Sequence, residues 1–395
     1  MIEKKILRSV LAKLVSGGVR ITYWDGTTET YGPDKPYLHI TIKSRKVVRD
    51  VLARNSVGFG EAYMDGNLLI DGSIDQMIRL TAENKKIFRR LVRIAHTTAL
   101  KKGYQRNKRS GQKRQIAHHY DIGNDFYKLW LDSSMTYSCA YFKKLTDTLE
   151  QAQQQKVGHI LKKLQLKKGQ TLLDIGSGWG TLAITAARQY GVKVTGISLS
   201  EEQVKHSKAA AKAAGVDKLV SFSVMNYQDL AESGKQFDRV VSVGMFEHVG
   251  RGNQDEYFTA ISTLLKDKGL SVLHTISKDT EMRSDSWINK YIFPGGYIPS
   301  VRQVVGALPD YDFHLVDYEN LRIHYAMTLD EWLRRFEKNS DKVAKMFDER
   351  FVRMWRFYLA ASSGSFRYGQ IGLSQFVFTK GNVNDLPLTR EFLYK

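Results

Sequence analysis

The sequence has few of the residues that would cross-link a chain or anchor it in a bilayer. A single cysteine, Cys139, occurs in 395 residues, which excludes an intramolecular disulfide and any zinc or iron–sulfur site that needs several cysteines. No apolar run approaches the roughly 18 residues that a membrane-spanning helix requires. The N-terminal stretch alternates charged and apolar residues and lacks the apolar core of a signal peptide. Together these absences predict a cytoplasmic protein.

Acidic residues are scarce as well, and the deficit is uneven along the chain. The formal net charge is +19. Residues 1–115 hold 24 Lys and Arg but only 10 Asp and Glu, a balance of +14, whereas the remainder carries +5. Such an asymmetry favours a polyanionic partner, either nucleic acid or the anionic inner face of a membrane. The alternative is a soluble domain with a basic, solvated surface.

The N-terminal part predicts a small α+β domain. Two strands are expected within residues 18–31, a third strand within 37–43 and a helix over 45–54. Residues 58–72 have the glycine punctuation of a loop with a short strand. From 74 to 100, apolar residues recur at helical spacing with basic residues among them. This pattern suits either a helix that lies on an anionic bilayer or one that docks within the protein.

A change of composition separates this part from the rest of the chain. Residues 101–115 are basic and nearly free of aliphatic residues, as is typical of a linker. Strands and helices alternate after it, which predicts a parallel sheet with helices on both faces. A late strand in residues 372–381 is expected to close the edge of this sheet. The sequence thus predicts a basic domain over 1–100, a linker, and an α/β domain over 116–395.

A glycine-rich turn follows the first strand of the α/β domain. Gly176, Gly178 and Gly180 form a GxGxG pattern between a predicted strand and a predicted helix, and Asp174 precedes it by two residues. A dinucleotide-binding loop has GxGxxG spacing instead. The pattern resembles motif I of methyltransferases that depend on S-adenosylmethionine (SAM). It implies an adenosine-bearing ligand without a pyrophosphate.

The second strand departs from the usual pattern of these methyltransferases. They commonly carry Asp or Glu at its end for the ribose hydroxyls, whereas this chain has Ser198 there. The two glutamates that follow belong to the first turn of a helix, where carboxylates suit the macrodipole. Ser200 and Gln203 have the spacing of a capping box. We therefore expect a neutral ribose contact from Ser198 and Gln203, and an adenine contact from Tyr227 after the third strand.

Polar residues also end two further predicted strands. Glu247 follows one strand and His274 lies near the end of another, where ligands bind in open α/β sheets. A histidine at a strand end often only satisfies a backbone partner. The spacing alone leaves catalytic and structural roles open for both residues.

Several longer segments together carry a family resemblance. They resemble the cyclopropane-fatty-acyl-phospholipid synthases and the related mycolic acid cyclopropane synthases from about residue 116 to the C-terminus. GEAYMDG at 60–66 extends the resemblance into the basic domain and favours the bacterial phospholipid enzymes, because the mycolic enzymes lack that domain. The segments are HHYDIGNDFYKLWLDSSMTYSCAYF (118–142), LLDIGSGWG (172–180), GMFEHVG (244–250), LHTIS (273–277), YIFPGGYIPS (291–300) and RIHYAMTLDEWLRRF (322–336).

The resemblance implies a Rossmann-like SAM-dependent methyltransferase domain that transfers a methylene group to the cis double bond of an unsaturated phospholipid acyl chain. In that family, methyl transfer yields a carbocation, and a bound bicarbonate takes a proton from the new methyl carbon as the ring closes. The implied bicarbonate cradle comprises Cys139, Glu247, His274, Tyr325 and the backbone of Ile276. The implied cofactor contacts are Tyr137, Ser138, Asp174, Gly176, Gly178, Ser198, Gln203 and Tyr227.

The chemistry places demands that the sequence can meet. An unactivated alkene is a poor nucleophile, so the site must align it with the methyl donor and exclude water. Aromatic faces can stabilise a cation without reacting with it. Methyl passes directly to the alkene, so Cys139 is expected to form a wall of the anion cradle rather than act as a nucleophile. Aromatic candidates near the site are Tyr141, Phe142, Phe246, Tyr291, Phe293, Tyr297 and Tyr325, of which about half are expected to be ordinary core residues.

The resemblance also suggests a use for the basic domain. The substrate double bond lies within a bilayer, so the enzyme must sit on the membrane and draw an acyl chain into its pocket. We therefore expect peripheral association with anionic lipid at the inner face of the cell membrane. Members of the family often form dimers, and the resemblance implies that this chain forms a homodimer.

Three other functions share some of these features. A fatty-acyl methyltransferase that leaves a branched chain is the nearest in sequence. An RNA methyltransferase would use the same cofactor loop and basic charge, but it needs a polar target pocket rather than an aromatic, nearly uncharged approach such as 291–299. A membrane-surface binding protein with a degenerate methyltransferase fold is disfavoured by the intact glycines and complete cradle. No nucleic acid partner is expected.

Overall fold

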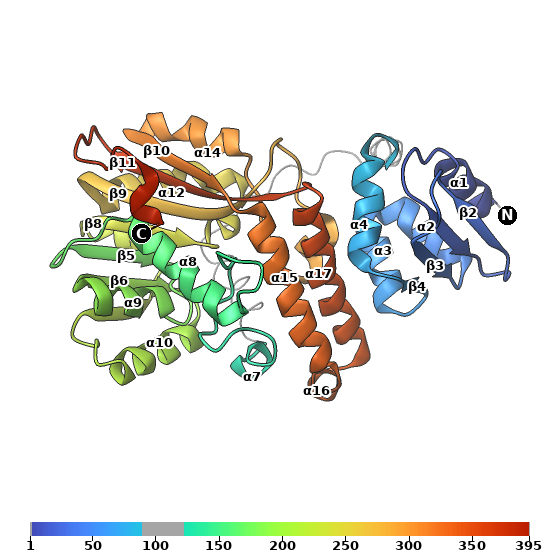
Figure 1. The fold of residues 1–395 in the computed structure, drawn as a ribbon, viewed down its shortest axis with the longest axis horizontal. Coiled ribbons are helices and arrows are strands. Elements are labelled where there is room, and N and C mark those ends of the chain that lie inside the picture. The colour runs from blue at the N-terminus through green and yellow to red at the C-terminus, as the bar shows by residue number, and fades with distance from the viewer. Residues whose placement is uncertain (1, 89–121, 395) are drawn as a thin grey trace. The chain divides into compact units, whose positions relative to one another are not determined.

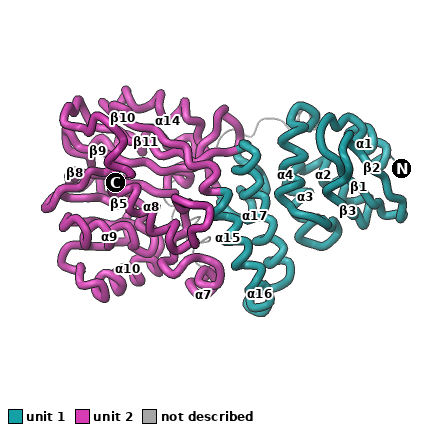
Figure 2. The backbone as a smooth tube through the Cα atoms, viewed as in Figure 1, with its two compact units in different colours: residues 1–103, 284–294, 326–370 teal, residues 104–283, 295–325, 371–395 magenta. Residues whose placement is uncertain are grey.

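The computed structural model describes residues 2–88 and 122–394 of the chain (Figure 1). Its residues fall into two compact units, coloured teal and magenta in Figure 2. Unit 1 comprises residues 1–103, 284–294 and 326–370, and unit 2 comprises residues 104–283, 295–325 and 371–395.

The compact units do not follow the order of the chain. Segments 284–294 and 326–370 belong with the N-terminal residues in unit 1. The predicted linker, residues 101–115, lies outside the described residues. The division into a basic domain over 1–100, a linker and an α/β domain over 116–395 therefore stays a prediction.

Unit 1 contains a four-stranded sheet in the order β2-β1-β3-β4. The first two strands form the predicted hairpin, with Val19 opposite Tyr31, and β3 runs parallel to β1. Val19 and Ile21 are buried while Arg20 is exposed, so β1 has one face in the core. The strands are β1 (Val19–Thr22), β2 (Thr28–Tyr31), β3 (Leu38–Ile42) and β4 (Leu68–Asp71).

Helices complete unit 1. Ser73 and Gln76 form a capping box at the start of α4, which covers the first part of the predicted helix over 74–100. The part of that prediction beyond residue 88 lies outside the described residues. The helices are α1 (Ile2–Leu11), α2 (Arg45–Arg54), α3 (Ser56–Met64), α4 (Ile74–Glu83), α13 (Ser286–Tyr291), α16 (Ser340–Met346) and α17 (Glu349–Arg367). Helix α15 (Arg322–Lys338) begins in unit 2 and ends in unit 1.

The prediction of a loop at residues 58–64 is wrong, because these residues belong to helix α3. Two glycines disfavour a helix in an isolated chain, but here they permit close packing. A Cβ on Gly58 would lie 2.1 Å from the Asp50 carbonyl oxygen, and one on Gly60 would lie 2.3 Å from the Trp287 indole. Tertiary packing therefore overrides the local preference.

Unit 2 contains a seven-stranded sheet in the order β10-β11-β9-β8-β5-β6-β7 (Figure 1). The five strands from β9 to β7 are parallel, as predicted, whereas β11 is antiparallel to its neighbours. The expectation that residues 372–381 close the sheet edge is wrong. Strand β10 forms that edge; most of its side chains are at least partly exposed, so it lacks a clear apolar pattern. The strands are β5 (Thr171–Ile175), β6 (Lys193–Ser198), β7 (Val220–Val224), β8 (Phe237–Val243), β9 (Leu265–Ser277), β10 (Phe313–Asn320) and β11 (Gly372–Lys380).

Helices cover both faces of this sheet and confirm the predicted α/β class. Leu172 packs with one hydrophobic core and its neighbour Leu173 with the other, since successive strand residues face opposite sides. One face is covered by α8 (Leu149–Lys163), α9 (Thr181–Tyr190) and α10 (Glu201–Ala213), and the other by α11 (Tyr227–Glu232), α12 (Gln254–Leu264) and α14 (Val301–Ala307). The short helices are α7 (Asn124–Tyr127), η1 (Phe246–His248), η2 (Arg251–Asn253), η3 (Leu308–Tyr311) and η4 (Arg390–Leu393).

Candidate active site

The glycine-rich turn after β5 has the backbone that its sequence predicts. Gly176, Gly178 and Gly180 have φ angles of 78°, 54° and 92°, a region of backbone conformation that residues other than glycine rarely adopt. The N–H groups of Gly176 and Ser177 both donate to the Ile197 carbonyl of β6, at 2.9 and 3.0 Å. The turn is thereby held against β6 and leaves a pocket beside it.

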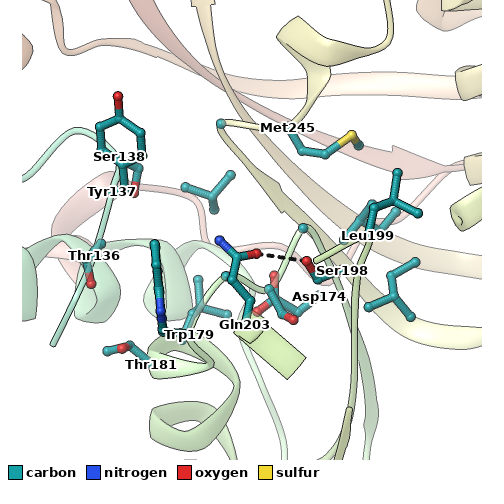
Figure 3. Close-up of a pocket in the computed structure, with 18 of the residues that line it drawn as sticks. Thr136, Tyr137, Ser138, Asp174, Trp179, Thr181, Ser198, Leu199, Gln203 and Met245 are labelled. Atoms are coloured by element: carbon teal, nitrogen blue, oxygen red, sulfur yellow. Dashed lines mark hydrogen bonds between the residues drawn. The ribbon is translucent and has the colours of Figure 1, made fainter. Parts of the chain in front are cut away.

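That pocket gathers the predicted cofactor residues (Figure 3). It lies at the carboxyl ends of the parallel strands β5, β6 and β8, where α/β sheets bind ligands. All eight residues line it: Tyr137, Ser138, Asp174, Gly176, Gly178, Ser198, Gln203 and Tyr227. Their individual contacts to a cofactor stay predictions.

A neutral hydrogen-bonded pair forms the pocket wall at the end of β6. The Ser198 hydroxyl donates to Oε1 of Gln203 at 2.8 Å (Figure 3). The Ser200 hydroxyl accepts the Gln203 backbone N–H at 3.3 Å, which is one half of the predicted capping box. The Ser200 N–H donates to Ser198 instead of to the Gln203 side chain. Gln203 thus faces the pocket rather than the helix start.

The segment before α8 is shaped by one buried carboxylate. Asp132 accepts the backbone N–H groups of Ser134, at 2.9 Å, and Thr136, at 3.0 Å. Met135 between them has a φ of 57°, a left-handed conformation that is uncommon outside glycine. This turn directs Tyr137 and Ser138 into the pocket (Figure 3).

Helix α8 fixes Ser138 by both its backbone and its side chain. The Gln153 amide donates to the Ser138 carbonyl at 2.9 Å, and the Lys156 ammonium donates to the Ser138 hydroxyl at 2.9 Å. Lys156 itself lines the pocket and was not identified as a site residue from sequence. A lysine at helical spacing from the buried Ala152 and Ile160 is the signal that could have identified it. Burial lowers the pKa of Lys156 to about 8.

Glu247 and Ile276, from the predicted anion cradle, contact each other directly. The Ile276 N–H donates to Oε1 of Glu247 at 2.6 Å. Oε2 of the same carboxyl is buried and has no hydrogen-bond partner among the described residues. Burial raises the pKa of Glu247 to about 7, although the Ile276 N–H opposes this rise.

His274 lies two residues before Ile276 on β9, so their side chains point to the same side of the strand. The Gln375 amide of β11 donates to Nδ1 of His274 at 3.0 Å, which places the ring proton on Nε2. That Nε2 is buried, and nothing in residues 2–88 or 122–394 accepts its proton. Burial lowers the pKa of His274 well below its usual value, so the ring is neutral. Sequence reasoning did not identify Gln375.

Cys139 and Tyr325 come from segments that are tied together. The Phe142 N–H donates to Nδ1 of His324 at 3.1 Å, which links the Cys139 segment to the first turn of α15, where Tyr325 lies. Cys139 is fully buried, and its thiol donates to the Ala140 carbonyl at 3.2 Å. No residue of the predicted cradle is among those that line the cofactor pocket in the described part of the chain.

Two of the aromatic candidates have structural roles. Tyr141 is stacked against both His159 and His324, at centroid distances of 4.2 and 4.8 Å. Phe246 is buried in the core against Tyr257, at 4.7 Å. Their packing positions the neighbouring Cys139 and Glu247 segments.

Comparison with known proteins identifies the family. A model described as mycolic acid cyclopropane synthetase matches residues 107–376, and one described as a domain of unknown function matches residues 6–91. The cyclopropane-fatty-acyl-phospholipid synthase of Escherichia coli K12 is 42% identical over 359 residues, 89% of this chain and 90% of that protein. A probable fatty acid methyltransferase of Pseudomonas putida is 37% identical over 390 residues, 95% of this chain and 96% of that protein.

A solved structure supports both fold and cofactor class. The mycolic acid cyclopropane synthase CmaA1, complexed with SAH and CTAB, is 32% identical and superimposes with a TM-score of 0.64 over 68% of this chain and 98% of its own. The match confirms the predicted Rossmann-like fold. The chain therefore belongs to the mycolic acid cyclopropane synthetase family of SAM-dependent methyltransferases.

Proposed function

We propose that this protein uses SAM to convert the cis double bond of an unsaturated phospholipid acyl chain into a cyclopropane ring. The observation that carries the proposal is the pair of buried polar atoms at the predicted cradle. Nε2–H of His274 is a donor and Oε2 of Glu247 an acceptor, and neither has a partner in the described structure. The name of the Escherichia coli relative supports the phospholipid substrate.

The pocket residues suit SAM, which when bound supplies an activated methyl group. Asp174 provides a carboxylate, the Ser198–Gln203 pair offers polar groups without charge, and Tyr227 offers an aromatic face. The Asp132 turn and helix α8 hold Tyr137 and Ser138 at the pocket. A site built in this way limits the motion of the methyl donor, which the weak nucleophilicity of an alkene requires.

The cradle residues suit bicarbonate, which when bound supplies the base for ring closure. Nε2–H of His274 would donate to an anionic oxygen, and Oε2 of Glu247 would accept from the bicarbonate hydroxyl. The Ile276 N–H and the Gln375 amide hold these two side chains in orientation. The substrate cation would then lose one proton from the transferred methyl carbon, and the resulting electron pair closes the ring.

Trideuteromethyl SAM tests the reaction directly. The enzyme is incubated with vesicles of an unsaturated phospholipid, and the released acyl chains are examined by mass spectrometry before and after catalytic hydrogenation. A cyclopropane retains two of the three deuterium atoms and has no double bond to hydrogenate. Retention of all three deuterium atoms, or a product that still takes up hydrogen under mild conditions, would contradict ring formation.

A fatty-acyl methyltransferase that leaves a branched chain is the second candidate. It is favoured by the Pseudomonas putida relative, whose name describes a probable fatty acid methyltransferase. Such an enzyme would share the cofactor pocket and would differ in where the cation loses its proton. The deuterium assay separates the two reactions because a methyl branch formed by proton loss from the chain keeps all three labels.

We also propose that the basic N-terminal region docks the enzyme on anionic lipid as a peripheral membrane protein. None of the helices in the described part of the chain combines the length and apolarity needed to span a membrane. We expect the protein to sediment at least about tenfold more with vesicles containing phosphatidylglycerol than with phosphatidylcholine alone, and high salt to remove the difference. Equal binding to both lipids would contradict this role.

A further inference from the structure

The cofactor pocket contains a buried basic side chain and a buried acidic one. Lys156 projects from α8 with 3% of its surface exposed, and Asp174 lies near the end of β5 with 2% exposed. Both residues line the pocket. Asp174 was predicted from sequence, whereas Lys156 is supplied by the tertiary structure.

These two side chains are not satisfied by each other. The described residues contain no ion pair between Lys156 and Asp174, and the hydrogen bond of the ammonium goes to the Ser138 hydroxyl at 2.9 Å. Oδ2 of Asp174 is buried without a partner in the part of the chain that the structure describes. A buried carboxylate oxygen without a partner and a buried ammonium whose hydrogen bond goes to a neutral hydroxyl are both costly, so they indicate a ligand that completes them. The ligand must offer both an anion and a cation.

The position of the pair indicates which end of the ligand it meets. Asp174 is on β5, whereas the predicted adenine residue Tyr227 follows β7, with β6 between the two strands. Lys156 donates to Ser138. The Ser138 Cβ would lie 3.9 Å from a Cβ added to Gly244. Gly244 follows β8, which is next to β5 on the side away from β6. The charged pair therefore lies at the end of the pocket away from the adenine.

We propose that the Lys156 ammonium binds the α-carboxylate of SAM and so completes a charge clamp with Asp174, the motif I residue that the resemblance already implies as a cofactor contact and that would bind the α-ammonium. The proposal rests on the assignment of this pocket to SAM. The zwitterionic end would satisfy both buried groups at once. Lys156 would then act as a cofactor-positioning residue, and its bond to Ser138 would couple the clamp to the Cys139 segment.

The ionisation of both groups agrees with this geometry. Burial raises the pKa of Asp174 to about 7, and Lys156 opposes that rise. Burial lowers the pKa of Lys156, and Asp132, Cys139 and Asp174 oppose that change. Binding of opposite charges would favour the ionised form of each group.

The clamp can be tested with two ligands that differ only at the proposed contact. S-adenosylhomocysteine (SAH) has the amino-acid end, whereas 5′-methylthioadenosine has the same adenosine and thioether without it. We expect Lys156→Met to weaken SAH binding about 10–100-fold, measured by calorimetry, and to leave 5′-methylthioadenosine within about twofold of the unmodified protein. Asp174→Asn is expected to show the same selective loss.

Two further variants separate charge from structure. Lys156→Gln keeps a donor for Ser138 and removes the charge, so it should reproduce the selective loss even if Lys156→Met does not fold. Lys163→Met is the matched control, because Lys163 is a buried lysine of the same helix that pairs with Glu319 outside the pocket. It should leave both affinities unchanged.

The outcomes are distinguishable. Equal loss of both ligands in Lys156→Gln, or no loss of either, would overturn the clamp. Failure of the unmodified protein to bind SAH would instead overturn the cofactor assignment. Neither measurement uses lipid or turnover, so an absent cyclopropane product would leave the result on the clamp standing.

Discussion

Replacing Glu247 with glutamine should abolish turnover, by about 10²–10⁴-fold or more, while SAH affinity stays within about twofold. Glutamine keeps the oxygen that accepts the Ile276 N–H and nearly the same volume. It places a donor where the buried, unpartnered Oε2 of the carboxyl now lies, so the proposed contact with a bicarbonate hydroxyl is lost. Single-turnover kinetics with labelled SAM and calorimetry with SAH measure the two quantities. A large loss of SAH affinity would make Glu247 a cofactor residue instead.

The same substitution should stabilise the protein at alkaline pH. Burial raises the pKa of Glu247 from 4.5 to about 7, so the folded state binds a proton at this carboxyl more tightly than the unfolded state does. Its contribution to stability is complete below the unfolded pKa and is lost as pH rises through the folded pKa. Glutamine does not ionise. Near pH 8, the free energy of unfolding of Glu247→Gln, measured with urea, should therefore exceed that of the unmodified protein by up to about 3 kcal/mol, with little difference near pH 5. Equal stabilities at both pH values would contradict a buried, titrating Glu247.

Replacing Gly60 with alanine should destabilise unit 1 by about 3 kcal/mol, at the upper end of the usual cost of overpacking. The new Cβ would lie 2.3 Å from Cδ1 and Nε1 of the Trp287 indole, which is rigid and buried. Urea unfolding measures the loss. Gly158→Ala is the control, because Gly158 is also helical and has no neighbouring atom within 4 Å of its Cβ position.

A double-mutant cycle identifies the contact responsible. Trp287→Ala removes the indole atoms that the added methyl group at position 60 would meet, so it should reduce the cost of Gly60→Ala by about 1 kcal/mol or more. Additive effects of the two substitutions would mean that the indole is not what restricts residue 60.

This contact explains the GEAYMDG motif of the basic domain. Glu61 accepts from Lys290 at 2.6 Å and from the Tyr291 hydroxyl at 2.7 Å, and the sulfur of Met64 accepts from the Trp287 indole at 3.4 Å. Gly60 leaves room for that indole. The motif therefore holds helix α13 within unit 1 through these contacts.

Local sequence was sufficient for the elements that local chemistry controls. The GxGxG turn after β5 was predictable because three positive φ angles require glycine. The alternation of strands and helices in unit 2 was predictable because apolar spacing differs between the two. Both signals come from residues close together in the chain. The eight cofactor residues that line the pocket were implied by the family resemblance, which rests on several separate motifs.

Other features depend on residues far apart in the chain and could not be predicted from local sequence. Gln375 orients His274 across 101 positions of sequence, and Lys156 enters the cofactor pocket because α8 packs its buried face on the sheet. Helix α3 forms at a glycine-rich segment because the Trp287 indole fills the space that Gly60 leaves and the Asp50 backbone fills the space that Gly58 leaves. In each case the free energy that stabilises the observed arrangement comes from burial or hydrogen bonding between segments far apart in the chain, which no local pattern encodes.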